Sequence, residues 1–210
     1  MGGVISPLLA NLYINRFLKY WRITERGKAF WAYVVSYADD FVILSLGGGR
    51  QALEWTRKVI KQMGLTLNEE KTVIRDAQKE AFDFLGYTFG TLWLKKDGSR
   101  YMGARPSKVS IDRLKREVRA QLKPQEKGPW LEVCRRLSAL LKGWSAYFSY
   151  GTTQPAFRAV ERNVYERVRC FLVQRHRMRS RGIRRFPSER VFGEMGVFLP
   201  RPIRANRCVS

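Results

Sequence analysis

Two adjacent aspartates, Asp39 and Asp40, are the residues of this sequence best suited to chemistry. They lie in the stretch WAYVVSYADDFVILSL, between two runs of β-branched and aromatic residues. Adjacent carboxylates repel each other, and neither belongs against a buried sheet unless positive charge lies between them. Two apolar runs around a short polar centre predict a β-hairpin with the aspartates at or near its tip. The pair is then either the polar end of a turn or a site for metal ions.

Enzymes that polymerise nucleotides hold two Mg²⁺ ions on carboxylates, roughly 3.5–4 Å apart. If Asp39 and Asp40 both lie in extended backbone, their side chains point to opposite faces, so only one is a direct ligand. A working site then needs a further carboxylate from elsewhere in the fold. Aspartate is also common in turns, but a simple turn does not need two unpaired charges against a buried sheet. The pattern favours metal-dependent nucleic-acid chemistry over a plain turn.

The charge of the chain supports a nucleic-acid partner. The formal net charge is +22, with 40 Lys and Arg against 18 Asp and Glu. Residues 1–104 hold 15 of these cations and 10 of the acids, whereas residues 105–210 hold 25 and 8. A surplus of this size in one folded half indicates a polyanionic partner, with nucleic acid favoured over an anionic membrane surface. No apolar run reaches the roughly 18–20 residues of a membrane span, so we expect no membrane partner.

Cysteine and histidine are too few for a metal or disulfide framework. Cys134, Cys170 and Cys208 are odd in number and widely spaced, and His176 is the single histidine. This pattern fits neither a zinc site nor paired disulfides. We expect buried thiols in a reducing, cytoplasmic compartment. His176 lies within the basic run RHRMRSRGIRR, where a general base is not expected, and a histidine-rich nuclease site is excluded.

The elements expected to position these residues change character along the chain. Residues 1–104 predict an α+β layer structure. It comprises a helix from Pro7, the aspartate hairpin, a helix ending at Gly64, strand–turn–strand in LTLNEEKTVIRD, and a hairpin around Asp97-Gly98. Later residues predict a helix over 111–122, a linker at 123–129, a helix from Trp130 and a third after Pro155. Apolar stripes on these helices predict packing.

Arginines remain on the outside of the third helix and in the segment that follows it. Helical spacing places the first three roughly on one face, away from the apolar stripe, and the others lie in the arginine-rich segment 175–190. We expect this set to bind RNA: Arg158, Arg162, Arg169, Arg175, Arg177, Arg179 and Arg181.

Six stretches of the sequence resemble one family. Four of them are similar, in order and approximate spacing, to the palm motifs of reverse transcriptases: GGVISPLLANLYIN, YADDFVIL, GLTLNEEKT and FDFLGYTF. Their residues resemble most those of the bacterial group II intron-encoded class. LKGWSAYFSYG and RRFPSERVFGEMGVFLP resemble the maturase domain of those proteins. The resemblance implies a partial polymerase palm at 1–104, an antiparallel sheet with packed helices. An all-α region follows, with the thumb starting at 105–127 and the remaining thumb and maturase domain at 128–210.

The resemblance assigns roles to individual residues. It implies that Asp39 and Asp40 are the metal-binding pair, with Asp39 the direct ligand, and that a complete site holds two Mg²⁺ ions. Lys71 matches a lysine placed near the triphosphate, although it is equally explained as one more lysine on a charged turn. Nucleotide, template and primer contacts are implied for the residues beneath the templating base, beside the primer terminus and in the primer grip: Gly2, Gly3, Ser6, Pro7, Tyr37, Ala38, Phe84, Leu85, Gly86 and Tyr87.

The implied partners are intron RNA, an RNA template, a DNA primer and deoxynucleoside triphosphates. In the family a third carboxylate and the fingers precede the glycine motif, and the sequence has no such region ahead of Gly2. We therefore expect little polymerase activity from this chain alone, with a separate N-terminal half or a second copy as a further partner. The rival hypothesis is an RNA-binding maturase-type splicing cofactor, or a remnant of one, that does not copy RNA.

Overall fold

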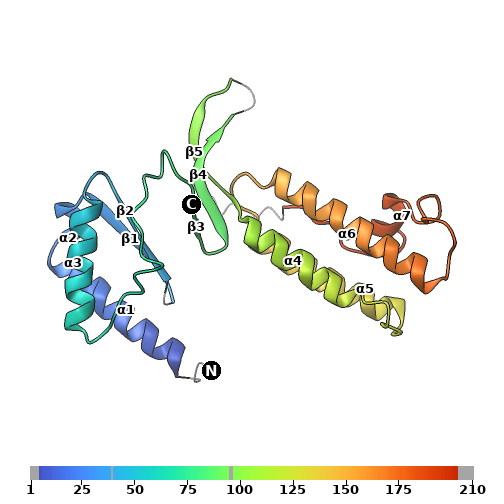
Figure 1. Ribbon diagram of the computed structural model, residues 1–210, viewed down its shortest axis with the longest axis horizontal. Coiled ribbons are helices and arrows are strands. Elements are labelled where there is room, and N and C mark those ends of the chain that lie inside the picture. The colour runs from blue at the N-terminus through green and yellow to red at the C-terminus, as the bar shows by residue number, and fades with distance from the viewer. Residues whose placement is uncertain (1–4, 39, 95–96, 203–210) are drawn as a thin grey trace, which may run out of the picture. The chain divides into compact units, whose positions relative to one another are not determined.

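The computed structural model of the protein describes residues 5–38, 40–94 and 97–202 (Figure 1). The chain divides into two compact units, Met1–Asp76 and Ala77–Ser210, here called the N-terminal unit and the C-terminal unit. None of the helices in the described ranges is both long and apolar enough to cross a membrane.

The N-terminal unit packs helices on one face of a two-stranded sheet. Phe17 and Trp21 of the first helix are buried, and the Trp21 ring meets Trp55 edge-on at 5.4 Å between ring centres. Proline in the first turn suits the start of this helix, since its missing N–H has no intrahelical partner there. The elements are α1 (Ser6–Ile23), α2 (Arg26–Ala29), β1 (Ala32–Tyr37), β2 (Asp40–Ser45) and α3 (Gly49–Gln62).

The strands predicted within LTLNEEKTVIRD are wrong, because residues 65–76 form no strand. A turn takes up the centre of this segment. The backbone N–H groups of Lys71 and Thr72 donate to the Asn68 carbonyl at 3.1 and 3.0 Å, and the Thr72 hydroxyl donates to the same oxygen at 2.8 Å. Local bonds to Asn68 satisfy these groups, so the β-branched residues here do not decide the conformation.

The C-terminal unit begins with a three-stranded antiparallel sheet in the order β3-β4-β5. Its strands are β3 (Phe82–Phe84), β4 (Tyr87–Trp93) and β5 (Arg100–Pro106). A two-residue turn joins β3 to β4, and the predicted hairpin around Asp97-Gly98 joins β4 to β5. Gly98 has φ +71°, a left-handed conformation that glycine adopts without steric cost.

Helices complete the C-terminal unit: α4 (Lys108–Gln121), α5 (Trp130–Tyr147), α6 (Gln154–Arg175) and α7 (Ser188–Phe192). The Ser107 side chain caps α4 by accepting the Ser110 N–H at 3.2 Å. The predicted apolar stripes form the core, with Leu137, Leu141 and Val160 almost fully buried. The α+β class and the three long helices are confirmed. The predicted antiparallel sheet is present as two small sheets, and α7 was not predicted.

The prediction of buried thiols is correct for one cysteine and wrong for another. Cys134 is buried on α5, whereas Cys170 is exposed on α6. Cys170 lies between the buried positions Val168 and Phe171, on the side of the helix turned to solvent. Cys208 lies outside the described residues.

Candidate functional site

The aspartate hairpin forms as predicted. β1 and β2 are antiparallel, with Tyr37 opposite Asp40, so residues 38 and 39 connect the strands. Ala38 has φ +52°, a left-handed conformation that costs a non-glycine residue roughly 1–2 kcal/mol. Asp40 is exposed at the start of β2. Asp39 lies outside the described residues, so the divergence of the two carboxylates stays a prediction.

One face of the hairpin presents aromatic side chains to solvent next to Asp40. Tyr33, Val35 and Tyr37 alternate along β1 and are exposed, whereas Ala32 is buried on the opposite face. This alternation follows from the two-residue period of a strand. Tyr37, the predicted neighbour of a primer terminus, is therefore accessible to a ligand, and so is Ala38.

Asp40 is the one described acidic residue at the hairpin tip that could bind a divalent metal. The oxygens of an exposed carboxylate such as Asp40 are suitable ligands for Mg²⁺. However, no group of three or more His, Cys, Asp or Glu side chains is close enough to hold a metal within residues 5–38, 40–94 and 97–202. Asp40 thus fits as one ligand, but the described residues do not complete a site for two ions.

The glycine motif lies largely outside the structure described. Gly2 and Gly3 are among the residues whose positions are not described, so their predicted role under the templating base stays a prediction. Ser6 is exposed and is the first residue of α1, and Pro7 lies in the first turn of that helix.

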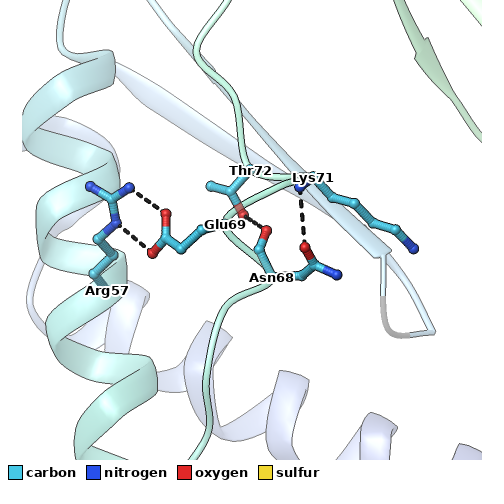
Figure 2. A network of polar contacts seen from close by, with 5 residues as sticks. All are labelled: Arg57, Asn68, Glu69, Lys71 and Thr72. Atoms are coloured by element: carbon cyan, nitrogen blue, oxygen red, sulfur yellow. Dashed lines mark hydrogen bonds and ion pairs between the residues drawn. The ribbon is translucent and has the colours of Figure 1, made fainter.

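Lys71 belongs to the turn that begins at Asn68 (Figure 2). Its backbone N–H lies 3.2 Å from the Asn68 side-chain oxygen, which holds the turn. Its side chain extends away from the neighbouring Arg57–Glu69 ion pair, whose closest N–O distance is 2.6 Å. In that pair, the hydrogen bond from Arg57 lowers the pKa of Glu69. The Lys71 ammonium group therefore takes no part in the Arg57–Glu69 ion pair.

The predicted primer-grip residues form the tight turn between β3 and β4. Leu85 and Gly86 both have positive φ, +49° and +76°, as expected of a two-residue hairpin turn. Phe84 and Tyr87 face each other as the last pair of the two strands.

Hydrogen bonds join this turn to α5 and to the start of α4. The Tyr147 hydroxyl donates to the Leu85 carbonyl at 2.9 Å, and the Tyr87 hydroxyl donates to the Tyr147 carbonyl at 2.6 Å. The Gly86 carbonyl accepts the Ser107 N–H at 2.8 Å and the Ser110 hydroxyl at 2.9 Å. Burial raises the pKa of the Tyr87 phenol.

Sequence reasoning missed these positioning residues. Tyr147 is separated from Leu85 by 62 residues, and Ser110 is separated from Gly86 by 24. No local pattern joins residues so far apart in the chain. A Cβ at position 86 would lie 2.8 Å from Ser110 Oγ and 3.2 Å from the Phe148 ring, so the space as well as φ requires glycine.

The arginine face of α6 is present but uneven. Arg158 is exposed, and Arg162 is exposed while paired with Glu166 one turn away at 3.2 Å. Arg169 is half-buried; its guanidinium carbon lies 5.4 Å from the centre of the Tyr165 ring. Its Nε atom is buried and has no hydrogen-bond partner in the described part of the chain. The shared face is therefore formed mainly by Arg158 and Arg162.

A shallow hollow of about 340 Å³ lies beside these two arginines. Its lining includes Tyr165 of α6 and Ser188 and Phe192 of α7. The Tyr165 hydroxyl donates to the Phe186 carbonyl at 3.2 Å, which fixes the ring at the edge of the hollow. Cations beside aromatic rings suit a nucleic-acid strand, because phosphates and bases contact the two kinds of group separately. Sequence reasoning assigned Tyr165 to no site.

The remaining predicted RNA-binding arginines follow the end of α6. Arg175 is the last residue of the helix, and its guanidinium carbon lies 5.9 Å from the Phe171 ring centre. Arg177, Arg179 and Arg181 are exposed in the segment before α7. Two further exposed arginines, Arg184 and Arg185, extend the same basic segment.

Comparison with protein families gives two matches on different parts of the chain. Residues 1–89 match the reverse transcriptase (RNA-dependent DNA polymerase) family, and residues 111–186 match the group II intron maturase-specific domain. No curated protein matches the chain significantly. The two matches have the order that the sequence motifs predicted, and the first implies dependence on divalent metal ions. The chain belongs to the group II intron reverse transcriptase/maturase family, whose partners are RNA and other nucleic acids.

Proposed function

We propose that this chain binds intron RNA through α6 and the basic segment after it, and that its hairpin tip carries the metal-binding aspartates of RNA-directed DNA synthesis. The observation that carries the proposal is a set of exposed arginines in a unit that matches the maturase-specific domain: Arg158, Arg162, Arg175, Arg177, Arg179 and Arg181. Guanidinium groups suit phosphate oxygens because they offer several donors in a planar fork.

The charge distribution supports the RNA-binding part of the proposal. The C-terminal unit holds 29 Lys and Arg against 11 Asp and Glu, and the N-terminal unit holds 11 against 7. Most of the surplus therefore lies in the unit that carries α6. Phosphate contacts of this kind release counterions, so affinity should fall steeply as the salt concentration rises.

Charge reversal on α6 tests the RNA-binding surface. The triple substitution Arg158→Glu, Arg162→Glu and Arg169→Glu should weaken RNA binding at about 0.1 M salt by at least about tenfold and flatten its salt dependence. Because Arg169 is half-buried, the double substitution at the exposed positions 158 and 162 should show the same trend without disturbing Tyr165.

A matched control uses exposed cations of the N-terminal unit. Arg16→Glu, Lys19→Glu and Lys58→Glu change the net charge by the same amount on α1 and α3. If this control weakens RNA binding as much as the α6 triple, binding responds to net charge alone. If the α6 triple leaves binding intact, the RNA surface lies elsewhere and the proposal is wrong.

The catalytic part of the proposal places metal chemistry at the hairpin tip. Two bound Mg²⁺ ions would activate the primer 3′-hydroxyl and stabilise the departing pyrophosphate of a deoxynucleoside triphosphate. Asp39 and Asp40 would supply ligands, and the Lys71 ammonium group would contact the triphosphate. The backbone of residues 84–87 would orient the primer end, since glycine permits close approach.

Substitution of Asp39 separates this activity from its rival. Asp39→Ala should abolish primer extension, assayed with the N-terminal half of a group II intron reverse transcriptase present, and should leave RNA affinity unchanged. Glu54→Ala, which removes an exposed acid of α3, is the control. If the chain is instead a splicing cofactor without polymerase activity, Asp39→Ala leaves splicing unaffected and no extension is seen with either protein.

The purified chain alone should extend a primer weakly or not at all. The supporting observation is that Asp40 is not joined by two further acidic or metal-binding side chains within the described ranges. Robust Mg²⁺-dependent extension by the purified chain would contradict this expectation.

A further inference from the structure

The β4–β5 hairpin carries an aromatic–cation pair near its loop, between the two stretches that match protein families, residues 1–89 and 111–186. Trp93 and Arg100 are directly opposite each other in the register of the two strands. The Arg100 guanidinium carbon lies 4.4 Å from the centre of the Trp93 ring, the shortest such distance among the described residues. Trp93 is nevertheless 59% exposed. Figure 1 shows this end of the hairpin extending away from the helices of its own unit.

The other aromatic residues on this side of β4 are held by the rest of the unit. Tyr87 packs against Phe148 at 5.0 Å between ring centres, and Phe89 stacks on Phe82 at 5.4 Å. Thr91 follows Phe89 on this side of β4, and its hydroxyl donates to the Gln78 carbonyl at 3.0 Å. Trp93 lies beyond these contacts, so its exposed ring surface is not part of the core.

Beside the pair, residue 94 and residues 97–99 are linked by hydrogen bonds to one another. The Asp97 carboxylate accepts the Ser99 N–H at 3.0 Å and the Ser99 hydroxyl at 2.8 Å, and these bonds lower the pKa of Asp97. The Leu94 N–H donates to the Ser99 carbonyl at 2.9 Å. Asp97 is therefore engaged within the loop, and no acidic side chain of the described residues forms an ion pair with Arg100.

We propose that Trp93 and Arg100 form a stacking platform for an unpaired base of the nucleic acid that the protein binds. The open surface of the indole ring would stack on the base, and the Arg100 guanidinium would contact the adjoining phosphate. This inference rests on the proposed function, because it takes a nucleic-acid partner as given. It adds a second contact, on the sheet, to the arginine surface of α6.

Charge and shape favour a single strand as the occupant. The chain has a net charge of +22, and Arg100, which forms no ion pair with an acidic side chain of the described residues, adds a cation at the platform. Met102, on the same side of β5 as Arg100, is 51% exposed and widens the apolar area. A duplex covers the faces of its bases by internal stacking, whereas an unpaired base offers a free face to an aromatic side chain.

A cation–π pair also stabilises an exposed hairpin. The test must therefore separate binding from folding. Trp93→Leu keeps apolar bulk but removes the aromatic face, and Trp93→Phe keeps an aromatic face. Trp31→Leu is the matched control, because Trp31 is 72% exposed in the N-terminal unit. Thermal unfolding of each full-length variant shows whether the fold is intact.

The measurement is affinity for three probes of about 20 nucleotides: single-stranded RNA, single-stranded DNA and duplex RNA. Trp93→Leu should weaken single-strand binding about tenfold, as expected for one stacked base, and change duplex binding little. Trp93→Phe should retain most of the affinity, and Trp31→Leu should retain all of it. Equal losses on single-stranded RNA and DNA also support the platform, since both present unpaired bases.

Arg100→Gln provides an independent measure. Loss of one phosphate contact on a single strand should reduce the slope of log affinity against log salt by about 0.7. The inference is overturned if Trp93→Leu leaves single-strand affinity unchanged, or if it weakens duplex and single strand equally. If the α6 triple substitution weakens RNA binding but Trp93→Leu does not, the proposed stacking role of Trp93 is wrong and the proposed function stands. When neither changes binding, both fail.

Discussion

The two compact units of this chain bury their apolar side chains to different extents. Among the described residues, the C-terminal unit has a cluster of nineteen buried apolar residues, and the N-terminal unit has a cluster of six. Fourteen of the twenty-two large apolar side chains exposed in these residues belong to the N-terminal unit, although it is the shorter of the two. The C-terminal unit therefore has the larger core of its own, and the N-terminal unit leaves more apolar surface uncovered.

The charge surplus follows the larger core. The C-terminal unit has 18 more cationic than acidic residues, and the N-terminal unit has 4 more. Like charges destabilise a compact state by mutual repulsion, so a strongly basic surface needs a core that outweighs the repulsion. The structure thus separates a well-packed basic unit, for which we propose RNA binding, from a smaller unit whose hairpin presents Asp40 and Tyr37.

Truncation of a buried side chain in the C-terminal unit should have the largest effect. Leu137→Ala on α5 should lower the free energy of unfolding by about 2–5 kcal/mol, because a fully buried leucine leaves a cavity. Leu131→Ala is the control on the same helix, where the side chain is 69% exposed, and should change stability by less than about 0.5 kcal/mol. Urea titration measures both. Equal effects would contradict the assigned core.

A substitution in the β3–β4 turn should have the next largest effect. Gly86→Ala combines a left-handed φ with close contacts to Ser110 and Phe148, so we expect a loss of about 2–3 kcal/mol. Gly98→Ala has a similar φ of +71° but no atom within 4 Å of the new Cβ, so about 1 kcal/mol is expected from strain alone. If both substitutions lower the free energy of unfolding equally, the helices do not hold the β3–β4 turn as described.

Exposed leucines of α1 should matter little to stability. Leu8 and Leu12 are 70% and 64% exposed, so replacing both with glutamine should change the free energy of unfolding by less than about 0.5 kcal/mol. Glutamine keeps good helix propensity, so the substitution removes only apolar surface. Chemical denaturation, with sedimentation velocity on both proteins, measures this. A loss above about 1 kcal/mol, or a smaller particle after substitution, would show that the face is covered in solution.

The sequence predicted those features that depend on local pattern. The hairpin at Tyr37 and Asp40 follows from two runs of β-branched and aromatic residues around a polar centre, and α4, α5 and α6 follow from their apolar stripes. The left-handed glycines at 64 and 98 mark a helix end and a loop, as glycine does where φ is positive.

Features that depend on distant contacts or on competing local bonds were not predictable. The strands expected in residues 65–76 do not form, because the Asn68 carbonyl accepts the backbone N–H groups of Lys71 and Thr72 in a local turn. The hydrogen bond from the Tyr147 hydroxyl to the Leu85 carbonyl joins residues 62 positions apart, a distance that no local sequence pattern spans. The Trp93–Arg100 pair requires the register of β4 and β5, which the loop sequence alone does not specify. The roles of all the predicted site residues stay predictions, and Asp39, Gly2 and Gly3 also lie outside the described residues.

The smallest effect is expected at the Arg57–Glu69 ion pair of the N-terminal unit. Both side chains are exposed, so the pair contributes little to stability. The hydrogen bond from Arg57 lowers the pKa of Glu69 in the folded state. A lowered pKa means that the stabilising contribution is present above the unfolded-state pKa and is lost as pH falls through the folded-state pKa.

Glu69→Gln should therefore lower the melting temperature slightly at neutral pH, and the difference from the unsubstituted chain should vanish as pH falls through the lowered pKa of Glu69. Glu70→Gln removes the same charge from the exposed neighbour without breaking the pair, so it separates the ion pair from net charge. Thermal melts across acidic and neutral pH measure both. A difference for Glu69→Gln that grows toward acid pH would show that the pair does not stabilise the turn beside Lys71.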